Sequence, residues 1–289
     1  MYRFLPYDPI KSNVNEKFMI LSYQSILRLL KRLAEKIKYR SSLHKNYVIE
    51  DIFLVSYPKS GNTWLRFLIA NAIKVHYRID QNVNFFSIDG IIPYALPKIN
   101  LQPAGPFGRT DLSRIIKSHS AYHPYYYRVI LLVRDPRDVM VSYFHYLKGL
   151  KQISEATTIS ELIRDDKYGI NSWVKHSKSW YFNHNPSGKT FKIFRYEDFL
   201  ENTKLQLFLL MECLGIIMDN ASLEEAIKLS SKERMKESEL KHTSINLVNE
   251  KMSFVRKGVA SRGQELSESD RKYIEDSSRD IASLLGYNF

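Results

Sequence analysis

The chain has 289 residues, of which 44% are hydrophobic and 26% charged, a balance typical of a soluble globular protein with one large domain or two small ones. Its formal net charge of +12 favours an anionic ligand, a nucleic acid or an acidic membrane surface, and charge alone does not choose among them. No apolar stretch reaches the length of a membrane span, no signal-peptide pattern opens the chain, and the single cysteine, Cys213, excludes an intramolecular disulfide, so we expect a cytoplasmic protein.

Residues 1–48 are predicted to form an N-terminal segment, apart from a main domain at residues 49–289. Residues 1–16 are polar and contain two prolines, which is typical of a tail. Residues 17–40 carry an apolar stripe at helical spacing with a basic opposite face. Such a helix can lie on a membrane surface. We favour the alternative, in which it docks on the protein with its basic face in solvent.

The stretch from Lys59 to Thr63 lies between a predicted buried strand at residues 52–55 and a predicted helix at residues 65–75. N–H groups at a helix start carry partial positive charge and bind oxyanions. Lys59 adds a cation, Ser60 and Thr63 add hydroxyl donors, and Gly61 lets the backbone approach a ligand. A nucleotide-triphosphatase loop instead places Lys directly after its last Gly, then Ser or Thr for magnesium. The stretch therefore predicts a phosphate loop outside the ATP and GTP pattern.

Two further strands end on candidate site residues. After an irregular excursion at residues 77–109, a short strand at 114–119 ends on Lys117 and His119. Ligands of open parallel sheets bind beyond the carboxyl ends of the strands, although a histidine there can also serve as a structural cap.

A continuous apolar run at residues 128–133 predicts a strand covered on both faces. It stops at Arg134, where a magnesium-binding motif would place Asp, and a helix to about residue 149 carries Ser142. Arginine at this point suits bidentate phosphate recognition without a metal. The alternative role for Arg134 is a salt bridge to Asp135 or Asp138.

The remaining chain continues to alternate. We expect helix at residues 160–184, a strand at 191–199, helices at 203–214 and 222–229, a polar loop at 237–250, a basic Gly-containing loop at 254–263 and a closing helix at 267–285. This alternation predicts an α/β fold, a three-layer sandwich around a central, mostly parallel sheet. Three separate segments then offer anion-binding groups at one edge of the sheet, and no acidic cluster suggests a metal site.

The chain resembles the cytosolic-type sulfotransferases that use 3′-phosphoadenosine 5′-phosphosulfate (PAPS). The matching motifs occur in the family's order from about residue 50 to the end of the chain. They are Tyr57–Trp64, Lys117–His119, Arg134–Asp138 with Val141–Tyr143, Arg195–Asp198, and Arg256–Gly258.

The resemblance implies the roles of individual residues. His119 matches the catalytic base, and Lys59 and Lys117 match lysines that stabilise the transferring group. It also implies the residues that bind PAPS and release adenosine 3′,5′-bisphosphate: Lys59, Ser60, Gly61, Asn62, Thr63, Trp64, Arg134, Ser142, Tyr196, Arg256, Lys257 and Gly258. A family aromatic that stacks on adenine falls at Lys232 here, which puts the packing of adenine on that side in question.

The resemblance implies transfer of a sulfuryl group to a hydroxyl or amine of a small-molecule acceptor, without a metal and without nucleic acid as partner. The acceptor cannot be read from the sequence, and the oligomeric state is left open. Aromatic side chains are candidate pocket walls: Phe85, Phe86, Tyr94, Phe107, Tyr122 and Phe144. The competing hypotheses are a P-loop kinase, which would need magnesium and ATP, and an anion-binding or membrane-binding module.

Overall fold

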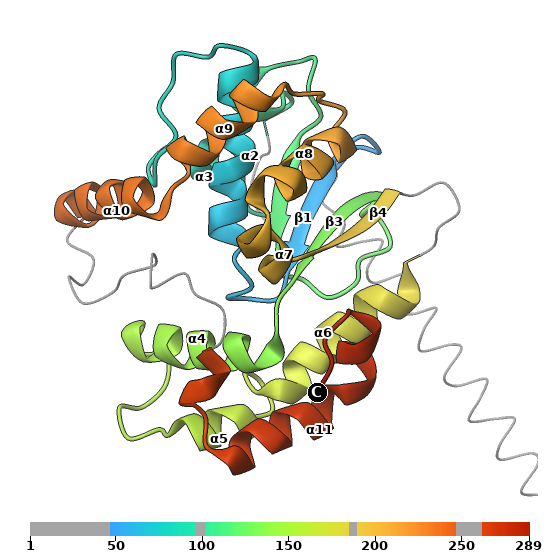
Figure 1. The fold of residues 1–289 in the computed structure, drawn as a ribbon, viewed down its shortest axis with the longest axis vertical. Coiled ribbons are helices and arrows are strands. Elements are labelled where there is room, and N and C mark those ends of the chain that lie inside the picture. The colour runs from blue at the N-terminus through green and yellow to red at the C-terminus, as the bar shows by residue number, and fades with distance from the viewer. Residues whose placement is uncertain (1–46, 96–101, 185–189, 247–261) are drawn as a thin grey trace, which may run out of the picture. The chain divides into compact units, whose positions relative to one another are not determined.

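The computed structural model describes residues 47–95, 102–184, 190–246 and 262–289 (Figure 1). The predicted N-terminal segment, apart from residues 47 and 48, therefore lies outside the described residues. Arg256, Lys257 and Gly258 also lie outside them. The division of the chain at residue 48 stays a prediction.

A sheet of four parallel strands carries the fold. The strands are β1 (Ile52–Ser56), β2 (Ile115–Ser118), β3 (Arg128–Val133) and β4 (Thr190–Arg195), in the spatial order β2-β1-β3-β4. Each of the three described strand pairs is parallel. The predicted central parallel sheet is therefore confirmed. β2 and β3 lie on opposite sides of β1, so the strand order reverses at β1. In open α/β sheets, ligands bind in the crevice beyond the carboxyl ends of the strands at such a reversal.

Helices cover both faces of this sheet, because successive strand side chains point to opposite faces. Leu54 of β1 belongs to one buried cluster and Phe53 to the other. The first cluster includes α2 (Asn62–His76), α7 (Tyr196–Glu201), α8 (Thr203–Cys213) and α9 (Asn220–Leu229). The second includes α4 (Pro136–Gly149), α5 (Ile159–Arg164), α6 (Ile170–Asn183) and α11 (Glu268–Leu284). Figure 1 shows the two groups on either side of the sheet, which confirms the three-layer sandwich.

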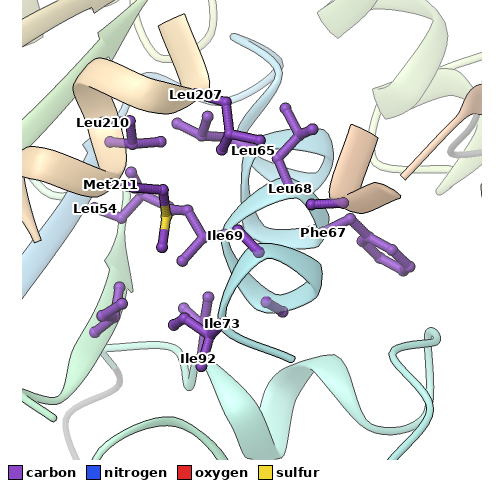
Figure 2. Close-up of a cluster of buried hydrophobic side chains, with 14 of the residues drawn as sticks. Leu54, Leu65, Phe67, Leu68, Ile69, Ile73, Ile92, Leu207, Leu210 and Met211 are labelled. Atoms are coloured by element: carbon purple, nitrogen blue, oxygen red, sulfur yellow. The ribbon is translucent and has the colours of Figure 1, made fainter. Parts of the chain in front are cut away.

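Helix α2 is fixed by apolar side chains around most of its circumference. Figure 2 shows its Leu65, Leu68 and Ile69 among Leu54 of β1 and Leu207 of α8. Fully burying one such side chain contributes about 1.5–3 kcal/mol relative to leaving it exposed. The loop that precedes α2 is thus held between two buried elements.

The predicted helix at residues 160–184 is wrong in its middle, because the chain turns between α5 and α6. The Asp165 side chain accepts hydrogen bonds from the N–H groups of Lys167 and Tyr168 at 2.8 and 2.7 Å. Gly169 then lies against the turn, where an added Cβ would be 2.4 Å from the carbonyl oxygens of Asp165 and Ile163. An aspartate that captures the following N–H groups offers the backbone an alternative to helix.

Gly169→Ala is expected to lower the free energy of unfolding by about 1–3 kcal/mol, because the new methyl group meets rigid backbone atoms. Gly90→Ala is the matched control, since a Cβ at Gly90 would meet nothing within 4 Å. Its effect should stay within about 0.5 kcal/mol. Denaturant unfolding of both variants measures the difference, and equal stabilities would contradict the steric argument.

Two other boundaries differ from the prediction. The strand predicted to reach residue 199 ends at Arg195, because its neighbour β3 ends at Val133, with which Arg195 pairs. The loop predicted at residues 237–250 is wrong for its first part, because α10 spans Lys232–Asn246. Strong helix formers dominate α10, and Met235 with Glu239 one turn later forms a buried face too narrow to be seen in the sequence.

The described parts of the predicted excursion, residues 77–95 and 102–109, are largely irregular and contain two short elements, α3 (Ile88–Ile91) and the 3-10 turn η1 (Pro106–Gly108). Tyr94 within it forms a parallel bridge to Lys117 of β2. A second 3-10 turn, η2 (Arg262–Glu265), precedes α11. Among the helices in the described ranges, none is both long and apolar enough to cross a membrane.

Candidate functional site

The loop between β1 and α2 presents the start of a helix at the carboxyl end of the sheet. Lys59 and Gly61 both adopt left-handed backbone conformations, with φ of 70° and 98°. Gly61 is the N-cap of α2 and has no side chain to cover the first N–H groups of the helix. A Cβ there would lie 2.4 Å from the Tyr196 ring, so only glycine fits. Ser60 Oγ is buried and has no hydrogen-bond partner among the described residues.

A cavity of about 600 Å³ opens on this loop. The loop residues Lys59, Gly61, Asn62, Thr63 and Trp64 line it, and so do further residues predicted from the sequence: Lys117, His119, Arg134, Ser142 and Tyr196. Lys228 and Lys232 line it too, and the described lining contains no carboxylate. The cavity is therefore strongly electropositive, which suits an anionic ligand.

Arg134, directly after β3, forms an ion pair with Asp138 of α4. Its Nη2 donates to Asp138 Oδ2 at 3.0 Å, and both side chains are buried. Asp138 Oδ1 also accepts from the N–H of Gly263 at 2.9 Å. One carboxylate thus fixes Arg134 and the backbone that follows the undescribed basic segment. The salt bridge expected as the alternative role of Arg134 is present, and Arg134 nevertheless lines the cavity.

Aromatic rings surround the cations of the cavity. Lys59 Nζ lies 4.2 Å from the centre of the Tyr146 ring, and the guanidinium of Arg134 lies 4.4 Å from that of Tyr196. Trp64 meets Tyr196 edge-on at 5.7 Å and donates from Nε1 to the carbonyl of Ser230 at 3.2 Å. These contacts order the side chains before any ligand arrives.

The Asn62 side chain hydrogen-bonds to β1 and to no other described element. Its Nδ2 donates to Ser56 Oγ at 3.1 Å and to the carbonyl of Leu54 at 3.4 Å. The amide therefore ties the first turn of α2 to β1, and Asn62 also lines the cavity.

His119 follows β2 and is oriented by β1. Its Nδ1 lies 2.7 Å from the carbonyl oxygen of Ser56. Because a carbonyl only accepts, Nδ1 carries the proton and Nε2 keeps its lone pair. Burial lowers the pKa of His119 to about 3, with the nearby charge of Lys117 acting in the same direction. The ring is therefore a neutral base that can receive a proton on Nε2.

Lys117 sits beside His119, with its Nζ 4.8 Å from the centre of the Tyr94 ring. Burial lowers the pKa of Lys117 to about 8, and the charge of Arg66 adds to the effect, while Asp89 opposes it. Tyr94 also meets His119 edge-on at 5.7 Å. A cation, a base and an aromatic wall thus converge at the carboxyl end of β2.

A second cavity, of about 350 Å³, shares His119, Pro58 and Tyr143 with the first. Its other lining residues are Tyr57, Ala121, Lys167, Tyr168, Ser172, Lys175 and His176. His119 therefore lies between two cavities, and the lining of the second includes three tyrosines and two lysines.

Of the predicted acceptor residues, Tyr94 reaches the site through His119, while none of the six lines either of these two cavities. Phe85 and Phe107 pack against one buried cluster and Tyr122 against the other. Phe86 is 48% exposed. Phe144 contacts the neighbouring His145 and Lys148.

Sequence reasoning did not assign Tyr143 and Tyr146 to the site, although both line the first cavity. Tyr146 lies one helical turn beyond Ser142 on α4, and residues four apart share a helix face. Helical spacing from Ser142 could therefore have identified it. The described residues contain no group of three or more His, Cys, Asp or Glu side chains that could hold a metal ion.

The family model of the sulfotransferase domain matches residues 49–277 of the chain. Among curated proteins, the chain is 28% identical to sulfotransferase 4A1 of Mus musculus over 196 residues, which are 62% of this chain and 64% of that protein. The chain thus spans less than two thirds of that relative's length. It is 27% identical to sulfotransferase 1E1 of Bos taurus over 72% of this chain and 75% of that protein.

Solved structures share the fold. A retinol dehydratase in complex with androsterone and the inactive cofactor PAP superimposes with a TM-score of 0.64 at 18% identity, over 84% of this chain and 83% of that one. The mouse sulfotransferase SULT7A1 in complex with PAP gives a TM-score of 0.57 at 20% identity, over 82% of this chain and 86% of that one.

Proposed function

Because the chain belongs to the sulfotransferase domain family, we propose that it transfers a sulfuryl group from PAPS to a hydroxyl or amine of a small molecule. The observation that carries the proposal is the position of His119, which lines both cavities. This oriented, neutral base lies between the electropositive cavity and the second cavity, whose lining includes three tyrosines. Two substrates that react with each other need such neighbouring sites.

The first cavity fits the nucleotide. Ser60 lies between the lining residues Lys59 and Gly61 but does not itself line the cavity, and its buried Oγ has no hydrogen-bond partner among the described residues. The N–H groups at the start of α2 are open to an oxyanion. Lys59 and Arg134 would bind the two phosphate ends, with Ser142 beside Arg134. Trp64 and Tyr196 would contact the base. Lys232 lines the cavity where an aromatic was expected, and Ile227 and Met235 provide apolar surface close by.

Each catalytic residue has one task in this proposal. When bound, PAPS supplies the activated sulfuryl group. His119 Nε2 takes the proton of the acceptor as its oxygen or nitrogen bonds to sulfur. Lys59 stabilises the negative charge that grows on the departing bridging oxygen, and Lys117 stabilises the transferring group. The reaction leaves a sulfated acceptor and adenosine 3′,5′-bisphosphate.

A small acceptor agrees with the size of the second cavity and with the androsterone or retinol held by the structurally similar retinol dehydratase. We keep a cytoplasmic location as a further proposal, based on the single cysteine of this sequence.

Thermal-shift titration tests the nucleotide assignment. Adenosine 3′,5′-bisphosphate should raise the melting temperature by several degrees at 100 times its Kd, which corresponds to about 2.7 kcal/mol. Mg-ATP at the same concentration should give a much smaller shift, because the loop lacks the Lys and Ser or Thr placement of the triphosphate motif. A larger shift with Mg-ATP would support the kinase alternative instead.

A further inference from the structure

The second cavity contains a buried histidine that the proposed mechanism does not use. His176, on α6, is 7% exposed and lines this cavity together with His119. Its Nε2 atom is buried, and no group among the described residues hydrogen-bonds to it. Leaving a buried polar atom without a partner costs free energy, so native proteins rarely do so without a reason.

Burial keeps this ring uncharged. The backbone of Ser120 is its polar neighbour, and the Ser120 carbonyl accepts a hydrogen bond from Trp180 Nε1 at 2.9 Å. Burial lowers the pKa of His176 to about 4, which keeps the ring neutral near pH 7. A neutral imidazole can form one hydrogen bond with a hydroxyl group at Nε2.

The walls around His176 suit a ring-shaped molecule. Tyr57 meets the His176 ring edge-on at 5.6 Å, and Tyr143 meets Tyr57 and Tyr168 in the same way at 5.9 and 5.8 Å. The same cavity also has polar lining residues, Lys167, Ser172 and Lys175. Aromatic walls with a few polar groups beside them suit a ring-shaped ligand that carries oriented hydroxyls. A ring in this cavity that offers one hydroxyl to His119 can offer another to His176.

We propose that His176 recognises a second hydroxyl of the acceptor, and that the preferred acceptors are ring compounds with two or more hydroxyls. This inference rests on the proposed function, since it takes His119 as the base for the reacting hydroxyl. His176 acts here as a recognition residue: its Nε2 atom forms a hydrogen bond with the second hydroxyl and takes no part in the transfer itself. An acceptor with a single hydroxyl leaves Nε2 unpaired and loses that interaction.

Sulfuryl transfer from PAPS to phenol, catechol, resorcinol and hydroquinone tests the proposal, with release of adenosine 3′,5′-bisphosphate as the readout. At least one of the three diols should exceed phenol in kcat/KM by about tenfold, the effect of one buried hydrogen bond. His176→Phe should lower this diol-to-phenol ratio to the statistical value for two equivalent hydroxyls. His176→Gln keeps an acceptor oxygen and should retain part of the preference.

Ser177→Ala is the matched control, because Ser177 is buried beside His176 on α6 and lines neither cavity. It should leave the diol-to-phenol ratio at the wild-type value. Binding of adenosine 3′,5′-bisphosphate shows whether each variant is folded, and the wild-type ratio carries the test even where His176→Phe does not fold.

Three results would overturn the inference: equal kcat/KM for phenol and all diols, an unchanged ratio in folded His176→Phe, or no transfer to any of the four probes by a protein that binds the nucleotide. A different result would contradict the proposed function itself: a folded protein that does not bind adenosine 3′,5′-bisphosphate. The two failures are therefore distinguishable.

Discussion

Replacing His119 with alanine is expected to lower kcat by about 10²–10⁴-fold, the contribution of a positioned general base. The reason is that His119 Nδ1 donates a hydrogen bond to the carbonyl of Ser56 at 2.7 Å. This bond fixes the tautomer in which Nε2 is unprotonated and can accept a proton. Nucleotide binding should survive, because the phosphate-binding groups proposed for the first cavity lie on the β1–α2 loop and at the end of β3. Thermal shift with adenosine 3′,5′-bisphosphate and steady-state transfer measure the two properties independently.

His145→Ala is the control for this experiment, since His145 lies on α4 and lines neither of the two cavities. Its activity should match the wild type. Full activity in His119→Ala, with normal nucleotide binding, would remove His119 from the role of base.

The pH dependence of kcat/KM for PAPS follows from the same geometry, because this parameter reports the groups of the free enzyme. The base must be unprotonated, and the pKa of His119 is lowered from 6.5 to about 3, so the acid limb should lie well below pH 6.5. Lys117 must be protonated, and its pKa of about 8 means that activity should fall as the pH rises through 8. In Lys117→Arg this second limb should move to higher pH.

The second large effect is expected for Lys59→Ala, with a fall in kcat of about 10²–10³-fold, the scale of losing one group that stabilises developing charge. Binding of adenosine 3′,5′-bisphosphate should weaken less than kcat falls, since Arg134 and the start of α2 stay in place. Alanine is the informative replacement because the φ of 70° at this position is unfavourable for lysine and alanine alike. The substitution therefore removes the charge without relaxing the backbone.

Lys74→Ala provides the matched control at the other end of α2. Lys74 carries the same charge, lies in the last turn of the helix and lines neither of the two cavities. It should leave kcat unchanged, whereas a loss equal to that of Lys59→Ala would point to a general effect of net charge on nucleotide binding.

The sequence was sufficient for the parts of the molecule whose residues act locally. The apolar run at Ile52–Val55 predicted β1, and the residues of the β1–α2 loop predicted an anion site at the helix start, because strand burial and helix-terminus chemistry depend on neighbours in sequence. The positions of Lys117, His119 and Arg134 followed from the rule that parallel strands end at one edge of a sheet.

Other features depend on contacts that sequence patterns do not encode. The break at Asp165 depends on one side chain capturing two backbone groups, and the helix α10 depends on burial of Met235 against a distant cluster. The aromatic residues chosen for the acceptor pocket were selected by composition alone. Tyr57, Tyr168 and His176 line the second cavity because tertiary contacts without a local signal bring them together. The Tyr57 hydroxyl donates to the carbonyl of Tyr168, and the Tyr57 ring meets that of His176 on α6.

The contact between Gly61 and Tyr196 joins residues more than a hundred positions apart, because the ring lies where a Cβ of residue 61 would be. The β1–α2 loop therefore packs directly against α7, which follows β4 in the chain. We expect ligand binding at this loop to stabilise the whole domain rather than the loop alone. In the bound protein, slowed amide hydrogen exchange should extend from α2 to β4, and the two should unfold as one cooperative unit.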